Sequence, residues 1–275
     1  MGLRINTNVA SLSAQRAMSL SSRQLEKSMI QLATGDRFSN VKDGAADFAI
    51  AEKLRAQAKG MEAAKNNADN AVNFVQVAEG GLNEQNNLLI RMRELAVQAA
   101  SDTYSDDHRK LMNYEFQQLS QEVDRIALST TYGSKRLLAG EGSNYKFQVG
   151  PNTGDDNTVS YDSTTNTTAS ELDVKGQGVL DKSDANDSIK YVDKAIEKVA
   201  TARASFGAIQ SRFDSIVNYT SDQIVSIQDA HSKMADTDVA KAYSDVMKQQ
   251  ALQQYQIAAL SAANRWPADA IKLVV

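Results

Sequence analysis

The 275-residue sequence predicts a mainly α-helical protein. We expect a long coiled-coil helical rod, with antiparallel N- and C-terminal halves and a small β-hairpin region. Residues 61–99 and 189–234 each place small or apolar side chains on one face, at alternating spacings of three and four. A repeat of 3.5 residues keeps such a face on one side of a slightly underwound helix, so each helix needs a long helical partner. Composition agrees, because the chain has only two prolines and 6% aromatic residues.

The apolar faces of residues 61–99 and 189–234, here called the first and second stripes, differ in how many polar residues they contain. Gln85 is the only polar member of the first, whereas four of fourteen positions in the second are polar. The helices would be about 58 and 68 Å long, which favours a rod over the alternative of a compact bundle. The first stripe consists of Met61, Ala64, Ala68, Ala71, Val75, Ala78, Leu82, Gln85, Leu89, Met92, Ala96 and Ala99. The second consists of Ile189, Val192, Ile196, Val199, Arg203, Phe206, Gln210, Phe213, Val217, Thr220, Ile224, Ile227, His231 and Met234.

The spacing of apolar residues over 1–33 predicts a helix with a thin apolar face. Such a helix buries little surface, so we expect it either to be disordered until a partner covers it or to dock within the molecule. Gly35 ends the helix, and a polar connector and a short helix from Ala45 to about Gln57 follow. The apolar face of the first helix consists of Ile5, Val9, Leu12, Met18, Leu20, Leu25, Met29 and Leu32.

The middle of the chain predicts a returning helix and a hairpin. Asp106 or Asp107 is the expected N-cap of a helix over 107–128 that folds back on the rod. Apolar and polar residues then alternate over 145–149 and again over 158–161, on either side of a turn cluster, which predicts a β-hairpin. Residues 162–187 contain few apolar groups and predict an exposed loop region at the tip of the rod.

The last helix is expected over 236–264, from an Asp236-Thr237-Asp238 cap to a point before Trp266-Pro267. Like residues 1–33, it is amphipathic but poorly filled with large apolar side chains. The simplest arrangement is that the two terminal helices pair with each other and then with copies from neighbouring molecules.

Motifs for catalysis or ligand binding are missing from the sequence. The two histidines, His108 and His231, have no metal-ligand spacing, and no common phosphate loop or nucleophile elbow occurs. We therefore expect no enzyme activity, no catalytic residue, no cofactor and no metal.

Charge, cysteine content and hydropathy exclude several other classes of protein. A net charge of −4 gives no reason to expect nucleic-acid binding, and the absence of cysteine excludes disulfides and thiolate chemistry. The sequence predicts neither a cleaved secretory signal nor a membrane span, so an exported chain would need another route.

Several stretches resemble bacterial flagellin, and together they span essentially the whole chain. The most specific is Arg91-Met92-Arg93-Glu94-Leu95-Ala96-Val97-Gln98-Ala99-Ala100. The others are Ile5-Asn6-Thr7-Asn8, Leu12-Ser13-Ala14-Gln15-Arg16, Leu32-Ala33-Thr34-Gly35-Asp36-Arg37-Phe38-Ser39, Asp43-Gly44-Ala45-Ala46, Glu122-Val123-Asp124-Arg125-Ile126, Gln249-Gln250-Ala251 and Ala262-Ala263-Asn264.

The resemblance implies a structural subunit that polymerises into the extracellular flagellar filament for swimming motility. Residues 1–43 and 235–275 would form the inner tube, and residues 44–234 the rod with its hairpin, without inserted outer domains. Assembly residues would be Ile5, Val9, Leu12, Leu25, Leu32, Leu95, Val246, Leu252, Tyr255 and Leu260.

The resemblance also implies partners. Besides copies of itself, these are the flagellar type III export apparatus, an export chaperone, the filament cap and hook-junction proteins. In family members sensed by the host Toll-like receptor, the contact residues match Arg91, Leu95 and Glu115.

Two other functions compete with this interpretation. A hook–filament junction protein shares the helical ends, and the Arg-Glu-Leu-Ala-Val-Gln run favours flagellin over it. A non-polymerising coiled-coil scaffold would remain monomeric, with helical termini, under salt that drives assembly.

Overall fold

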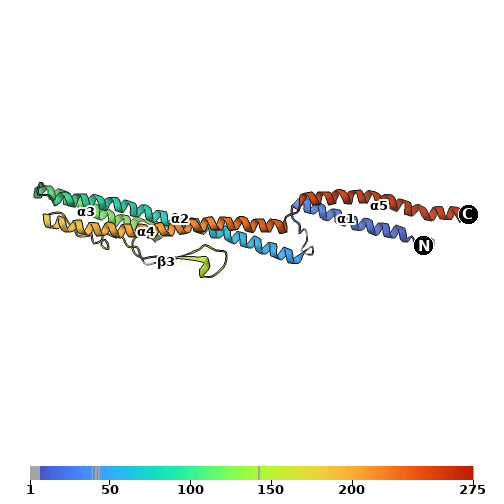
Figure 1. Ribbon diagram of the computed structural model, residues 1–275, viewed down its shortest axis with the longest axis horizontal. Helices are drawn as coiled ribbons and strands as arrows, with labels where there is room; N and C mark the ends of the chain where they lie inside the picture. Colours follow the sequence, from blue (N-terminus) through green and yellow to red (C-terminus); the bar gives the residue numbers. More distant parts are fainter. Residues whose placement is uncertain (1–6, 39, 41, 43, 142, 275) are drawn as a thin grey trace. The chain divides into compact units, whose positions relative to one another are not determined.

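The computed structural model describes residues 7–38, 40, 42, 44–141 and 143–274. The chain divides into two compact units, which are described separately (Figure 1). Unit 1 comprises Met1–Gln57 and Ser226–Val275, and unit 2 comprises Ala58–Val225. For the assembled protein we expected one domain of residues 1–43 and 235–275 and another of residues 44–234. That division stays a prediction.

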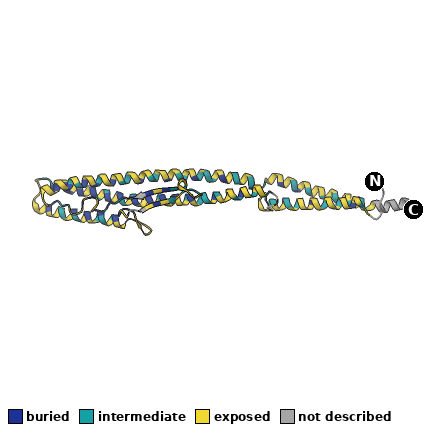
Figure 2. Cartoon of the chain, turned by 90° about the horizontal axis from the view of Figure 1, so that it is seen from below, coloured by how far each residue is buried: buried dark blue, intermediate teal, exposed yellow. Residues whose placement is uncertain are grey.

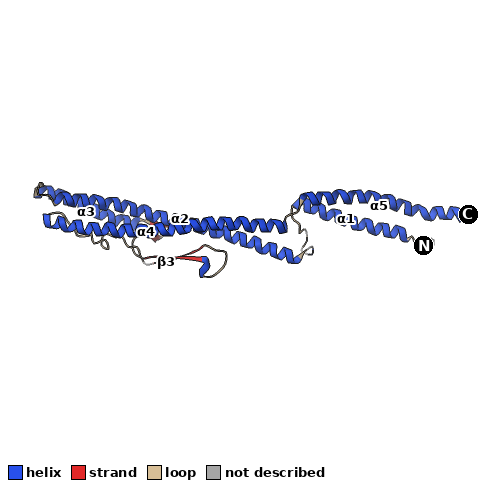
Figure 3. Cartoon of the chain, viewed as in Figure 1, coloured by secondary structure: helices blue, strands red, loops and turns tan. Residues whose placement is uncertain are grey.

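Long helices form the body of unit 2, as expected (Figure 3). They belong to α2 (Ala45–Ala99), α3 (Asp106–Ser129) and α4 (Lys182–Ala235). Eleven of the twelve positions in the first stripe, all except the half-buried Met61, are at most 1% exposed. Phe206 and Phe213 of α4 and Phe116 of α3 belong to the same core, so the predicted pairing of the two stripes is confirmed.

The predicted break between a short helix ending near Gln57 and the long helix is wrong, because α2 is continuous from Ala45 to Ala99. Gly60 lies inside the helix, where glycine usually costs stability. A Cβ at Gly60 would lie 3.0 Å from the Cβ of Pro151. Close approach of the loop after β3 therefore explains this glycine.

The predicted hairpin is confirmed. Strand β3 (Ser143–Gln148) pairs antiparallel with β4 (Thr158–Ser163), with Tyr145 opposite Tyr161 and Phe147 opposite Val159. The 3₁₀ turn η2 (Asp155–Asn157) connects them. Phe74 of α2 lies edge-on to Tyr145 and Phe147, so aromatic packing holds the hairpin against the helix. A second, two-residue pairing joins β1 (Thr131–Tyr132) to β2 (Lys135–Arg136).

The predicted exposed loop after the hairpin is wrong, because residues 164–181 form a strap that packs into the core of unit 2. Four of its five apolar side chains are at most 1% exposed, and the fifth, Leu180, is 46% exposed. Side chains of α3 bind its main chain: Asp124 accepts from Ala169 N–H, Asn113 accepts from Val179 N–H, and Gln117 donates to Gln177 C=O. The buried strap residues are Thr167, Ala169, Leu172, Val174 and Val179.

In unit 1 the two terminal helices, α1 (Val9–Thr34) and α5 (Val239–Val274), lie side by side and antiparallel (Figure 1). The pairing that we expected is confirmed. Gly35 ends α1 with a left-handed φ of 75°, and Asp238 caps α5 by accepting from Lys241 N–H.

Two predicted helix ends are wrong. The helix α5 continues past Pro267 to Val274, because a proline removes one hydrogen bond without necessarily ending a helix. The N-cap of α3 is Ser105, since the helix begins one residue earlier than expected.

Candidate functional site

The seam between α1 and α5 is unusually polar. The side chains of α1 that it buries are serines, of which Ser28 is only 2% exposed. Leu25 and Leu32 lie half-buried beside them, and α5 contributes the buried Ala242 and Val246. Small side chains permit close approach of the helices, but they remove little apolar surface from water. The buried serines are Ser11, Ser21 and Ser28.

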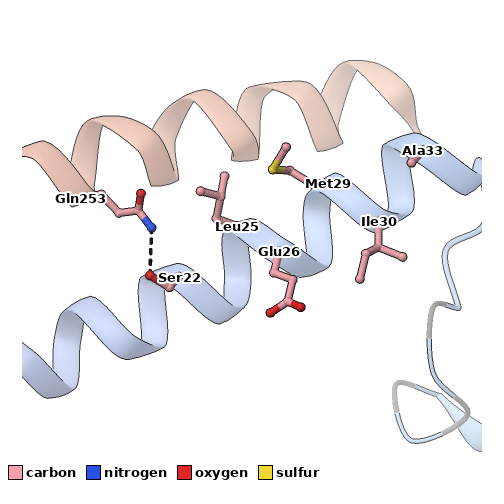
Figure 4. A pocket seen from close by; sticks show the side chains of 7 residues that line it. All are labelled: Ser22, Leu25, Glu26, Met29, Ile30, Ala33 and Gln253. Atoms are coloured by element: carbon pink, nitrogen blue, oxygen red, sulfur yellow. Dashed lines mark hydrogen bonds between the residues drawn. The ribbon is translucent and has the colours of Figure 1, made fainter.

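Hydrogen bonds hold this seam together. Ser21 Oγ donates to Gln249 Oε1 at 2.9 Å. Gln253 Nε2 donates to Ser22 Oγ at 3.0 Å, as Figure 4 shows. Each such neutral hydrogen bond contributes only about 1 kcal/mol net. The pairing within one chain is therefore specific but weak.

Large apolar side chains of both helices lie on the outside. Exposure reaches 75% at Tyr255 and is 37% at Leu252. Exposed residues accordingly cover most of this helix pair, whereas buried residues concentrate in unit 2 (Figure 2). Exposed large apolar side chains that gather on one helix pair are typical of a protein interaction site. The outward residues are Val9, Leu12, Leu20, Met29, Ile30, Val239, Tyr243, Met247, Leu252, Tyr255 and Ile257.

An open groove of about 520 Å³ lies beside the seam (Figure 4). Leu25, Met29 and Ala33 of α1 give it an apolar lining, with Glu26 and Gln253 at its edges. The groove adds to the outward apolar surface of the helix pair.

The predicted assembly residues divide by position. Val9, Leu12, Leu252 and Tyr255 lie on the outside of the helix pair, where a neighbouring molecule can reach them. Leu25, Leu32, Val246 and Leu260 are buried or half-buried. Ile5 lies outside the described residues.

Leu95 lies in the core of unit 2. Its side chain is 2% exposed in the single chain, and its expected roles in subunit assembly and receptor contact stay predictions. The sequence marks Leu95 as apolar, but burial depends on α3 folding back over α2.

Arg91 and Glu115 are exposed and paired across α2 and α3. Arg91 Nη2 lies 2.8 Å from Glu115 Oε1, and Arg91 Nη1 lies 3.0 Å from Glu94 Oε2. Hydrogen bonds to Glu115 and Glu94 raise the pKa of the Arg91 guanidinium. These side chains therefore form a fixed, solvent-facing polar cluster.

Several outward residues, among them Tyr243, Met247 and Ile257, are not among the assembly residues that the sequence predicted. Periodicity identified amphipathic helices but could not tell which of two similar faces would meet the partner helix. The polar seam is visible only once α1 and α5 are side by side.

Within the described part of the chain, no group of three or more His, Cys, Asp or Glu side chains is placed to hold a metal ion. The helices in that part do not combine the length and hydropathy that a bilayer crossing requires.

Sequence comparisons match both ends of the chain to one family. Residues 5–143 match the bacterial flagellin N-terminal helical region, and residues 189–274 match the bacterial flagellin C-terminal helical region. The chain is 32% identical to a flagellin of Halalkalibacterium halodurans, covering 98% of this chain and 99% of that protein. It is 33% identical to the flagellar filament 30.7 kDa core protein of Treponema maltophilum, with the same coverage.

Solved structures show a similar fold. Bacillus cereus flagellin matches with a TM-score of 0.51 and 26% identity, over 56% of this chain and 88% of that one. A putative flagellar hook-associated protein from Vibrio parahaemolyticus matches with a TM-score of 0.59, over 70% of this chain and 100% of that one. Its identity of 14% supports the shared fold alone.

Proposed function

The chain belongs to the bacterial flagellin family, and from that premise we propose that it polymerises through the outward faces of α1 and α5. It is a structural subunit of the extracellular flagellar filament. The proposal concerns which side chains join the copies.

One observation carries the proposal: the helix pair is polar at its seam and apolar on its outside. Covering the outward side chains with neighbouring copies removes apolar surface from water, at about 25 cal/mol per Å². The seam alone supplies little of that stabilisation. The terminal helices should therefore be held weakly in a free chain and firmly in a filament.

Leu12 and Tyr255 test the outward faces. Replacing either with Asp should abolish seeded filament growth, scored by electron microscopy and sedimentation, because burial of a lone carboxylate is unfavourable. Gln24→Asp, at an exposed polar position of α1, is the matched control and should assemble normally. Wild-type filament yield from both Leu12→Asp and Tyr255→Asp would overturn the proposal.

Family membership also supports more specific partners for this chain. These are the type III export apparatus, an export chaperone, the filament cap and the hook-junction proteins. For the host Toll-like receptor, the exposed Arg91 and Glu115 are the residues that can make contact. Receptor activation by monomeric protein should fall in Arg91→Ala and stay unchanged in Arg55→Ala, which removes another exposed arginine of α2. Equal activation by both variants would remove Arg91 from the contact.

A further inference from the structure

Two methionine side chains of the terminal helices are exposed. The chain contains eight methionines, seven of which lie in the part that the structure describes. Met29 of α1 is 54% exposed and Met247 of α5 is 52% exposed. Among the described methionines these two alone are exposed, and both belong to the outward apolar surface of the helix pair. The buried or half-buried ones are Met18, Met61, Met92, Met112 and Met234.

Met29 is accessible to small molecules. Its side chain extends from α1 toward α5 and lines the open groove of about 520 Å³, together with Leu25 and Ile30 (Figure 4). Glu26 and Gln253 lie at the edges of this groove. Hydrogen peroxide is little larger than water, so it fits into a space of this size and can reach the thioether.

Met247 lies within the outward face of α5. Val239, Tyr243 and Met247 follow one another at spacings of four residues, so they lie on one side of the helix. All three side chains are exposed. A polar group at position 247 would therefore stand within an apolar surface.

A thioether reacts with hydrogen peroxide without help from a base or a metal. The sulfur lone pair attacks one peroxide oxygen, so that a sulfur–oxygen bond forms while the oxygen–oxygen bond breaks. The proton on the transferred oxygen moves to the departing oxygen, which leaves as water. The sulfur is oxidised by two electrons, the peroxide is reduced, and the product is methionine sulfoxide, a polar and chiral side chain.

A sulfoxide at either position should weaken the contacts between copies. Assembly through the outward faces covers these side chains, and a sulfoxide oxygen that is covered without a donor loses its hydrogen bonds to water. In the free chain the same oxygen stays hydrated. Oxidation therefore disfavours the filament more than it disturbs the helix pair.

We propose that Met29 and Met247 are modification sites at which hydrogen peroxide prevents a free chain from joining a filament. The inference rests on the proposed assembly through α1 and α5, which leaves both side chains accessible before assembly and covers them afterwards. Chains that are already assembled are accordingly protected from the reaction.

Mass spectrometry of peptides measures where peroxide reacts. In the free chain, Met29 and Met247 should oxidise several-fold faster than Met92, which is fully buried in unit 2. In assembled filaments both should oxidise more slowly than in the free chain, because neighbouring copies exclude the oxidant. Met92 is the internal reference in both samples.

Sedimentation after seeded growth measures the effect on assembly. Catalase removes the peroxide before seeds of untreated filament are added. The concentration of free chain that remains beside the filaments should rise at least about tenfold after oxidation, because the interface buries an unpaired polar group. Circular dichroism of the free chain should show unchanged helix content. Methionine sulfoxide reductases should restore the original concentration.

Two double variants assign the effect to these sulfur atoms. Met29→Leu with Met247→Leu keeps the apolar surface but cannot form a sulfoxide, so its assembly should withstand peroxide. Met61→Leu with Met112→Leu removes two half-buried methionines of unit 2 and is the matched control. The control should stay as sensitive to peroxide as the wild type.

The outcomes separate this inference from the proposed function. Equal assembly of treated and untreated wild type, with Met29 and Met247 oxidised, would overturn the inference. Equal peroxide sensitivity of the two double variants, or equal oxidation rates in filaments and free chains, would overturn it as well. None of these results touches Leu12 and Tyr255, whose substitutions test the proposed function separately. Failure of the untreated wild type to polymerise would reject both.

Discussion

The side-chain amide of Gln85 donates a hydrogen bond of 3.1 Å to the main-chain carbonyl of Thr167, and another of 3.0 Å to that of Val123. Three segments that are distant in sequence, α2, α3 and the strap, meet at this amide. Gln85 is the only polar member of the first stripe and is fully buried. Its two buried hydrogen bonds hold the strap against the helices.

Gln85→Ala should therefore destabilise unit 2. The substitution leaves a cavity and removes a donor from two buried carbonyls, at a cost of about 2–4 kcal/mol in the free energy of unfolding. Urea unfolding followed by circular dichroism measures the change. Gln76→Ala, at an exposed position of α2, should alter stability by less than about 0.5 kcal/mol. Equal effects of the two substitutions would contradict the role of Gln85.

The neighbouring glycines of α2 should respond with opposite signs. A Cβ at Gly81 would lie 2.6 Å from Thr130 Oγ1 and 2.9 Å from a Leu138 methyl group, so Gly81→Ala should lower stability by about 1–3 kcal/mol. Nothing lies within 4 Å of a Cβ at Gly80, so Gly80→Ala should raise stability by about 1 kcal/mol. Thermal melts of both variants decide the point; a shift in the same direction for both would be incompatible with this packing.

Leu95→Asp should act on folding before it acts on assembly. An unpaired carboxylate at this buried position should lower the free energy of unfolding by about 4 kcal/mol or more. Val97→Asp is the matched control, because Val97 is exposed on the same helix. Denaturant unfolding of the monomer separates the two effects, and a stable Leu95→Asp monomer that fails to polymerise would favour a direct role of Leu95 in assembly.

Tyr161 should make the fold sensitive to alkaline pH. Burial raises the pKa of its hydroxyl above the ordinary value of 10.0, although hydrogen bonds with Thr165 and Ser205 oppose the shift. The unfolded chain therefore ionises first as pH rises. The stability contributed by neutral Tyr161 is complete below pH 10.0 and is lost as pH rises through the folded pKa.

Urea unfolding from neutral to alkaline pH should reveal this loss in the wild type. Tyr161→Phe should flatten it, whereas Tyr219→Phe, at an exposed tyrosine, should not. A wild-type pH dependence that persists in Tyr161→Phe would assign it to other groups.

Local patterns in the sequence predicted most of the helices and the main hairpin. The 3.5-residue repeat from Met61 to Ala99 predicted a buried stripe, and eleven of its twelve members are buried. Alternation around Tyr145 predicted β3 and β4. These signals depend on the spacing of side chains along a helix or strand, which neighbouring residues alone determine.

Long-range packing decided the rest. The sequence predicted that a short helix ends near Gln57, but α2 continues through Gly60, where Pro151 packs against it. The strap was predicted to be an exposed loop, because the side chains of α3 that bind its main chain are distant in sequence. Leu95 is buried because α3 covers it, and Leu12 faces outward because the serines of α1 meet α5 instead. The sequence by itself determined where helices and strands form and which family the residues resemble. Only the tertiary structure decided which face of each helix remains in water, because that choice depends on the shape of the partner surface.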